Sequence, residues 1–324
     1  METLTVPRGL IADLVTPLRS DGAIDGPGLG RLLERVSPHA QAVLLASPRT
    51  GEGESLGPEQ RSLLLEHAIK ASHRSLVPFF VWVTQESEEG TIETIHLLNE
   101  VLEKSTRPCD LFLVDTPLYY HSNRKLPSFY ERLCSMVKGP ILLHNDPELI
   151  GGLAKPLKRN NIRTSILKEL VGLEKIGGVI FSGSLDRAHN YQKASRRRTD
   201  FRIYDGDEAH FLDYPSMSGV VSAGANLAPK AWGEITRSSL QLSAHKKNYP
   251  DHLHRIWESG DYLRNIREIY LQVPTALVKG VLSDIGVIET PLCTFSVHNM
   301  KEDMRRLKEL MTGFGDYPPG TGER

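Results

Sequence analysis

Residues 76–116 read LVPFFVWVTQESEEGTIETIHLLNEVLEKSTRPCDLFLVDT, and this stretch contains one complete strand–helix–strand pattern. The apolar runs at 76–83 and 110–116 have the length and composition of buried strands. Between them, residues 86–104 carry apolar side chains at helical spacing: Ile92, Ile95, Leu98, Val101 and Leu102. Continuous apolar strands that alternate with amphipathic helices predict a parallel sheet with both faces covered.

The same alternation continues toward both ends of the chain. Further strands are predicted at 9–18, 42–47, 139–144, 178–182, 201–204 and 219–223, and further helices at 28–36, 58–72, 126–137, 164–175, 185–195 and from 208. Eight such units predict a closed sheet, so the expected fold is an α/β (β/α)8 TIM barrel over residues 1–229. Residues 230–311 are predicted to form a C-terminal helical extension packed on the barrel, and residues 312–324 a disordered tail.

The size and composition of the chain fit this architecture. Its 324 residues exceed the typical barrel length of about 250, which leaves room for the extension. The 39 basic and 40 acidic residues nearly cancel, so neither a nucleic acid nor a membrane is predicted as a partner. Three cysteines are too few and too scattered for a disulfide framework. The chain has no long apolar run and no signal-like start, so a cytoplasmic location is expected.

Six short motifs follow one another between residues 9 and 311. They are GLIADLVTPL at 9–18, RTGE at 49–52, TPLYY at 116–120, LHNDP at 143–147, GVVSAGANLAP at 219–229, and VK at 278–279 followed by Gly286. In this order and spacing they resemble the dihydrodipicolinate synthase / N-acetylneuraminate lyase family of (β/α)8 aldolases. The resemblance covers nearly the whole chain and implies a site at the C-terminal face of the barrel.

The resemblance implies imine chemistry on pyruvate or another small 2-oxo acid. In that family a lysine on the sixth strand attacks the ketone, and the iminium accepts electrons while a carbon–carbon bond forms or breaks. A tyrosine on the fifth strand moves the proton, and a Thr-Thr loop holds the substrate carboxylate. No residues of this chain have metal-ligand spacing, so neither a metal nor another cofactor is predicted.

The motifs, carried over residue by residue, give a candidate site. The predicted substrate-binding residues are Arg49, Thr50, Gly51, Glu52, Ile180 and Gly206, and the predicted catalytic residues are His144 and Tyr120. Arg49 stands where the family has the first threonine of its loop, and His144 stands where it has the proton-moving tyrosine. Leu149 replaces an arginine that grips a substrate carboxylate in synthase-type members.

The lysine of the family falls on Ile180 when residues 162–182 are matched without a gap. An isoleucine cannot form an imine, so the usual chemistry is expected to be lost or altered. A different register would bring in Lys175, at the end of the VGLEK stretch. That register needs a strand over 170–176, and Glu174 would still occupy the aligned position.

Three functions stay open at this point. The first is a lyase-type barrel that binds a small anion such as a 2-oxo acid, with Arg49 supplying the counter-charge. The second is a non-catalytic relative that acts as a ligand sensor or as a subunit partner. The third is a metal- or histidine-dependent activity at the same mouth. Tyr119 and Tyr120 lie where family members contact a neighbouring subunit, so a homodimer or homotetramer is expected.

Two residues of the predicted site also have a structural interpretation. His144 either moves protons or is simply hydrogen-bonded to Tyr120 or to backbone. Arg49 either binds the carboxylate of the ligand or pairs with Glu52 or another neighbour. We expect Arg49 or His144 to point into the pocket, and we expect Ile180→Lys alone not to restore lyase activity.

Overall fold

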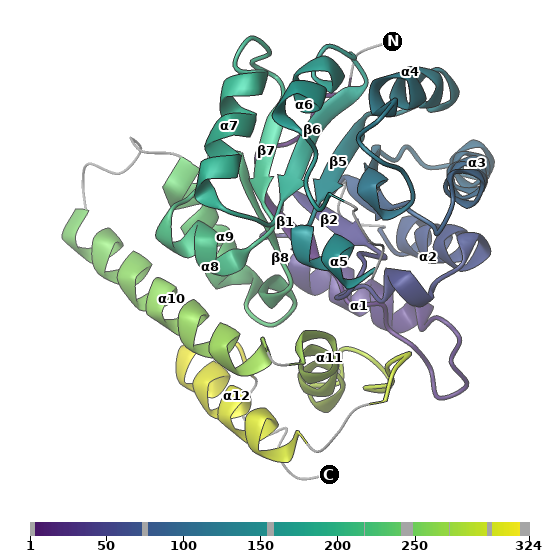
Figure 1. Ribbon diagram of the computed structural model, residues 1–324. Helices are drawn as coiled ribbons and strands as arrows, with labels where there is room; N and C mark the ends of the chain where they lie inside the picture. Colours follow the sequence, from purple (N-terminus) through teal and green to yellow (C-terminus); the bar gives the residue numbers. More distant parts are fainter. Residues whose placement is uncertain are drawn as a thin grey trace.

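The computed structural model describes residues 4–72, 77–153, 159–216, 218–240, 249–271, 273–296 and 300–317. Within these residues, eight strands pair in chain order and form a closed barrel. Closure comes from the parallel pairing of β8 (Gly219–Ser222) with β1 (Gly9–Asp13), and helices surround the strands (Figure 1). The predicted (β/α)8 barrel is therefore confirmed.

The strands and helices follow the predicted alternation. The other strands are β2 (Ala42–Leu45), β3 (Phe79–Trp82), β4 (Leu111–Asp115), β5 (Ile141–Asn145), β6 (Ile176–Phe181) and β7 (Arg202–Asp205). The helices of the barrel are α1 (Gly26–Val36), α2 (Pro58–Ala71), α3 (Glu88–Lys104), α4 (Leu126–Met136), α5 (Pro147–Gly152), α6 (Thr164–Leu170), α7 (Leu185–Ser195) and α8 (Glu208–Asp213). Short 3-10 helices are η1 (Gly53–Ser55), η2 (Pro117–Tyr119) and η3 (Gly224–Asn226).

The first strand is shorter than the predicted strand at 9–18. Strand β1 ends at Asp13, and the chain then turns back, because Leu18 pairs in antiparallel fashion with Ile24. Pro17 has no N–H to donate to a continued parallel ladder. Asp25 then starts α1 by accepting a hydrogen bond from the Gly28 N–H at 2.8 Å. The early end of β1 leaves Asp13 at the mouth of the barrel.

The structure shows which residues form the sixth strand, where the resemblance places the lysine of the family. Helix α6 ends at Leu170 and β6 begins at Ile176, so the helix is shorter and the strand begins earlier than predicted. Ile180 lies between His144 of β5 and Tyr204 of β7. Lys175 precedes the strand and its ammonium group donates to the Val137 carbonyl at 2.6 Å. Lys175 is therefore at the N-terminal end of the barrel, opposite the mouth, and the alternative register is wrong.

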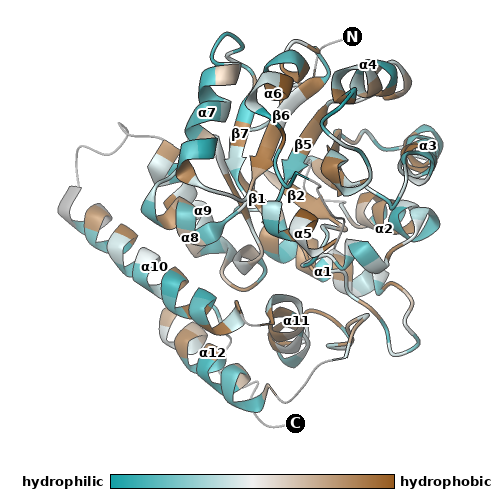
Figure 2. Ribbon diagram, viewed as in Figure 1, coloured by the Kyte–Doolittle hydropathy of each residue, from teal (hydrophilic) through white to brown (hydrophobic). Residues whose placement is uncertain are grey.

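Alternate side chains of the strands fill the interior of the barrel. The inner cluster consists of Val6, Ile11, Ala42, Leu44, Phe80, Trp82, Phe112, Val114, Leu142, Ile180, Tyr204 and Val221. The opposite faces of the strands pack against the surrounding helices in a second, larger cluster. Figure 2 shows the hydrophobic strands inside a ring of helices whose outer faces are mainly hydrophilic. The upper end of the inner cluster therefore forms an apolar floor under the mouth.

The C-terminal extension is helical, with α9 (Pro229–Leu240), α10 (Tyr249–Tyr270), α11 (Pro274–Asp284) and α12 (Lys301–Phe314). Helices α10, α11 and α12 lie together beside the barrel (Figure 1). Tyr262 stacks on Phe314 with ring centroids 4.0 Å apart, so α10 and α12 are held together. Tyr317 is buried, and the rest of the predicted tail, 318–324, lies outside the described residues. None of the described helices has the length and apolar character needed to cross a bilayer.

Candidate functional site

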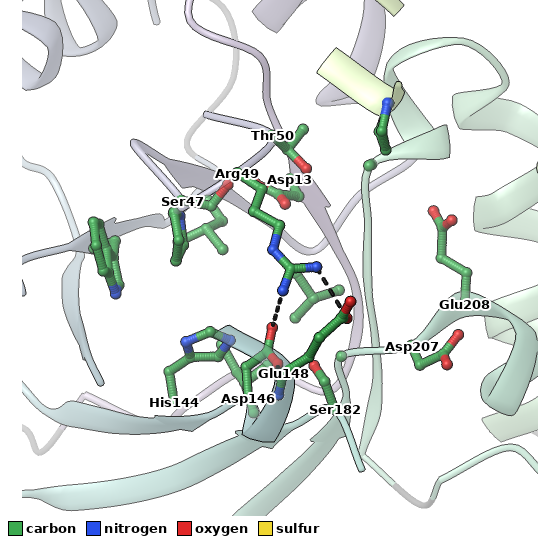
Figure 3. A pocket seen from close by; sticks show the side chains of 18 of the residues that line it. Asp13, Ser47, Arg49, Thr50, His144, Asp146, Glu148, Ser182, Asp207 and Glu208 are labelled. Atoms are coloured by element: carbon green, nitrogen blue, oxygen red, sulfur yellow. Dashed lines mark hydrogen bonds and ion pairs between the residues drawn. The ribbon is translucent and has the colours of Figure 1, made fainter. Parts of the chain in front are cut away.

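A cavity of about 270 Å³ opens at the C-terminal ends of the strands, where sites of (β/α)8 barrels form. Its polar lining includes Asp13, Ser47, Arg49, Thr50, His144, Asp146, Glu148, Ser182, Asp207, Glu208, Arg267 and Tyr270. These side chains come from the strand ends and their loops, and from the end of α10 (Figure 3). The extension therefore completes the site that the barrel begins.

The floor of the cavity is apolar. It is formed by Leu44, Trp82, Val114, Ile180 and Val221. Ile180 is 1% exposed and occupies the position that the sequence assigns to the lysine of the family. The described residues that line the cavity include no lysine at all. An amine for imine formation is therefore missing from this lining.

His144 lies at the end of β5 and is held by a hydrogen-bonded pair beneath it. The Trp82 Nε1–H donates to Thr116 Oγ1 at 2.8 Å, and the same hydroxyl is 2.8 Å from His144 Nδ1. Because the Thr116 hydroxyl already accepts from Trp82, we infer that its own proton is donated to Nδ1 and that His144 carries its ring proton on Nε2. Burial lowers the pKa of His144, so the ring is a neutral donor toward the cavity.

Arg49 lines the cavity but is not a free cation. Its guanidinium group is 3.1 Å from Glu148 and 3.8 Å from Asp146, as the dashed lines in Figure 3 show. Its side chain is 49% exposed, so it lies at the rim. Arg49 therefore pairs with Asp146 and Glu148. It does not pair with Glu52, which was one of the partners expected from the sequence.

A second arginine, which sequence reasoning missed, lines the mouth beside other carboxylates. Arg267 of α10 is 3.0 Å from Asp207 and 3.7 Å from Glu208. Glu208 also accepts hydrogen bonds from the Ser222 hydroxyl at 2.6 Å and from the Gly224 N–H at 2.8 Å. Arg267 lies about 60 residues beyond these carboxylates, so no local motif could indicate the contact.

Asp13 is the other residue that sequence reasoning missed. It lies at the end of β1 and lines the cavity together with Ser47 and Thr50, whose hydroxyls lower the pKa of its carboxyl group. Burial raises the pKa of Asp13 to about 7, against the effect of the two hydroxyls, and the charge of Glu208 adds to the rise. Asp13 Oδ1 is buried without a hydrogen-bond partner among the described residues. The signal in the sequence was a single carboxylate inside an apolar strand.

Two more of the predicted substrate-binding residues, Thr50 and Gly206, line the cavity. The Thr50 hydroxyl lies near the Asp13 carboxyl group and lowers its pKa. A Cβ on Gly206 would lie 2.2 Å from Ser182 Oγ, so a larger residue here would require the Ser182 side chain to move.

Three of the predicted site residues lie outside the cavity. Gly51 lies in the loop after β2, and its carbonyl accepts a hydrogen bond from the Thr16 hydroxyl at 2.6 Å. Glu52 has a left-handed backbone with φ of 56°, and its carboxylate is paired with buried Lys279 of α11. Tyr120 donates to Asp115 at 2.8 Å on the outer side of β4. The structure therefore does not bring these three residues to His144.

Tyr120 belongs to a buried hydrogen-bonded cluster around Asp115. Burial and the charge of Asp115 raise the pKa of Tyr120 well above its ordinary value. Asp115 itself accepts from Tyr130 at 2.7 Å and from Thr84 at 2.7 Å. This cluster anchors α4 and the loop after β4.

No group of three His, Cys, Asp or Glu side chains in the described part of the chain is arranged to hold a metal ion.

Comparison with known proteins gives a consistent result. A sequence model of the dihydrodipicolinate synthetase family matches residues 6–311. The 4-hydroxy-tetrahydrodipicolinate synthase of Alcanivorax borkumensis is 24% identical over 314 residues, which cover 95% of this chain and 98% of that protein.

Two solved structures share the fold of this chain. A monomeric dihydrodipicolinate synthase variant has a TM-score of 0.77 at 19% identity, covering 95% of this chain and 97% of its own. The chloride-inhibited dihydrodipicolinate synthase of Acinetobacter baumannii, solved in complex with pyruvate, has a TM-score of 0.74 at 19% identity. That alignment covers 96% of this chain and 99% of the other. Both similarities therefore extend over barrel and extension.

Proposed function

Because this chain belongs to the dihydrodipicolinate synthetase family and carries Ile180 where the resemblance places the imine-forming lysine, we propose an aldolase-type barrel that binds a small ligand without forming an imine. The observation that carries the proposal is the position of Ile180 on β6, inside the floor of the cavity. An alkyl side chain there can pack against a ligand but supplies no nucleophile.

No other described residue of the cavity replaces the missing amine. The cations that line it are Arg49 and Arg267, and a guanidinium group stays protonated in proteins. Lys175 lies at the other end of the barrel, and Lys279 is buried in its pair with Glu52. The usual route through a Schiff base is therefore lost in this proposal.

The ligand predicted from the sequence, a small anion such as a 2-oxo acid, is disfavoured by two features of the cavity. Thr50, which was expected to hold its carboxylate, lies beside the carboxyl group of Asp13. Arg49, which was expected to supply the counter-charge, is paired with Asp146 and Glu148. An added carboxylate would meet like charges and no unpaired cation. We therefore propose a ligand that does not depend on anion binding at this loop.

Trapping with borohydride tests the loss of imine chemistry. The full chain is incubated with pyruvate and sodium borohydride, and its intact mass is measured. We expect no reduced adduct, whereas the Acinetobacter baumannii synthase serves as the positive control. A stoichiometric adduct on this chain would overturn the proposal, and peptide mapping would then identify the amine.

The alternative is a non-catalytic relative that acts as a ligand sensor or a subunit partner. It is favoured by one observation, the mutual pairing of the charged groups at the rim: Arg49 with two carboxylates and Arg267 with two others. Arginines that are already held by carboxylates of the same chain are poorly placed to stabilise a reacting group. A ligand that raises the melting temperature but is recovered unchanged after long incubation would support this alternative.

We also propose, from the sequence, a cytoplasmic homodimer or homotetramer. Tyr119 and Tyr120, which were expected to reach a neighbouring subunit, donate to Glu54 and Asp115 of their own chain. Any subunit contact must therefore use other surfaces or leave these bonds in place. Size-exclusion chromatography with light scattering at micromolar concentration tests the assembly, and a monomer would contradict it.

A further inference from the structure

We propose that the cavity binds a small organic cation, a primary amine whose ammonium group is held by the Asp13 carboxylate. The inference rests on the proposed function, since it takes the ligand to be bound as an intact amine and not through an imine. It assigns a ligand class to the cavity, with Asp13 as the anchoring residue.

The charge of the lining is the first reason. Among the described residues of the cavity, five carry carboxylates and two carry guanidinium groups: Asp13, Asp146, Glu148, Asp207 and Glu208 against Arg49 and Arg267. Each arginine lies between two carboxylates, so each side of the rim keeps an excess negative charge. In a partly enclosed site this field attracts cations and repels anions.

Asp13 is the second reason, because it differs from the other four carboxylates. The others have an arginine within 4 Å, whereas the groups that interact with Asp13 are two hydroxyls and the carboxylate of Glu208. Its Oδ1 atom is buried without a partner among the described residues, although the residue lines the cavity. A buried acceptor without a donor is costly, and an ammonium group of a ligand supplies the missing donor.

The rest of the cavity fits the remainder of a small amine. Leu44, Val114 and Ile180 offer an apolar floor for a short alkyl chain. His144 presents its Nε2–H to an acceptor atom of the ligand, because its Nδ1 faces the Thr116 hydroxyl. A volume of about 270 Å³ leaves room for a small molecule only. We therefore expect one ammonium group, a short carbon chain and a second polar end.

Isothermal titration of the full chain with three probes tests this inference. The probes are 4-amino-1-butanol, 1,4-butanediol with the same carbon skeleton, and pyruvate, all at pH 8. This pH lies above the pKa of about 7 to which burial raises Asp13, so its carboxylate is ionised. We expect the amino alcohol to bind at least tenfold more tightly than the diol or pyruvate. In the Asp13→Asn variant we expect the affinity for the amino alcohol to fall at least tenfold.

The control variant is Asp186→Asn, which removes an exposed carboxylate from the first turn of α7 and should leave the affinity unchanged. Thermal melting of both variants verifies that they are folded. Failure of the amino alcohol to bind, equal binding of the diol, tighter binding of pyruvate, or an unchanged affinity in Asp13→Asn would each overturn the inference. Borohydride trapping with pyruvate reports separately on the proposed function, so the two failures are distinguishable.

Discussion

Two carboxylates near the mouth of the barrel, Glu52 and Asp13, have opposite surroundings. Glu52 is paired with Lys279, which is fully buried, and it also accepts from the Thr294 N–H at 2.6 Å. Asp13 has no such cation and keeps one oxygen without a partner among the described residues. A fully paired carboxylate fixes two parts of the fold, whereas an incompletely paired one is a candidate for contact with a ligand.

The largest effect is expected from removing the charge of Glu52. In Glu52→Gln the ammonium group of Lys279 stays buried without its counter-ion, and we expect the free energy of unfolding to fall by about 3–5 kcal/mol. Urea denaturation measures this loss. The control is Glu66→Gln, which removes an exposed pair with Lys70 and should cost less than about 1 kcal/mol. Equal losses in the two variants would show that the Glu52–Lys279 pair does not hold the extension.

The floor of the cavity gives the next largest effect. In Ile180→Lys an ammonium group enters the apolar floor, and we expect a loss of roughly 2–4 kcal/mol in stability. We also expect no lyase turnover, since the tyrosine that moves protons in the family is replaced by His144. Ile180→Met keeps the floor apolar and should cost less than about 1.5 kcal/mol. Strong turnover in the lysine variant would contradict the account of the site.

The substitution Asp13→Asn is expected to stabilise the protein at alkaline pH. The pKa of Asp13 is about 7 in the folded protein and near 3.8 ordinarily, so the folded state holds the proton more tightly. The stability that this raised pKa gives the folded protein is complete below pH 4. It is lost as the pH rises through about 7, where the ionised carboxylate faces Glu208. We expect Asp13→Asn to be more stable than the native chain by about 1–3 kcal/mol at pH 8, with no gain at pH 4.

Thermal melting between pH 4 and pH 8 tests this prediction, with Asp186→Asn as the control. An isosteric amide keeps the size of the side chain, so a change that depends on pH reports on its charge. A gain that is the same at both ends of this range would mean that the effect of Asp13→Asn comes from packing.

The smallest effect is expected at the rim. Arg49 and Glu148 are 49% and 82% exposed, so removing their pair in Arg49→Gln should change stability by less than about 1 kcal/mol. The loss of a cation from the mouth should increase the affinity for 4-amino-1-butanol about two- to fivefold, which titration measures. A large loss of stability would mean that Arg49 holds α5 in place through Asp146.

Much of the architecture could be predicted because it depends on patterns that are local in the sequence. Continuous apolar runs and amphipathic helices predicted the barrel, and the apolar run around Ile180 predicted the register of β6. The end of β1 was misplaced because the apolar pattern continues past Asp13, whereas the chain turns toward the pairing of Leu18 with Ile24. Propensity alone does not show where a ladder ends.

The candidate site was harder to predict, because it depends on direction and on distant contacts. Glu52 belongs to a motif that suggests substrate binding, yet its left-handed backbone turns it toward Lys279. Tyr120 belongs to the TPLYY motif, and in the structure it bonds to Asp115 on the outer side of β4. Asp13 and Arg267 meet at one cavity only after the barrel closes and the extension docks. No spacing of residues in the sequence indicates that these two distant side chains line the same cavity.

The pair between Glu52 and Lys279 has a consequence for the order of events during synthesis. The two residues are 227 positions apart, and translation at about 5–20 residues per second separates them by roughly 10–50 seconds. Thr275 and Thr290, which bond to the carbonyls of Arg49 and Leu18, also emerge late. Until then the loop after β2 holds a carboxylate without its counter-ion. The mouth of the barrel therefore matures only as the last fifth of the chain leaves the ribosome, and a nascent chain stalled before Lys279 carries an unfinished site.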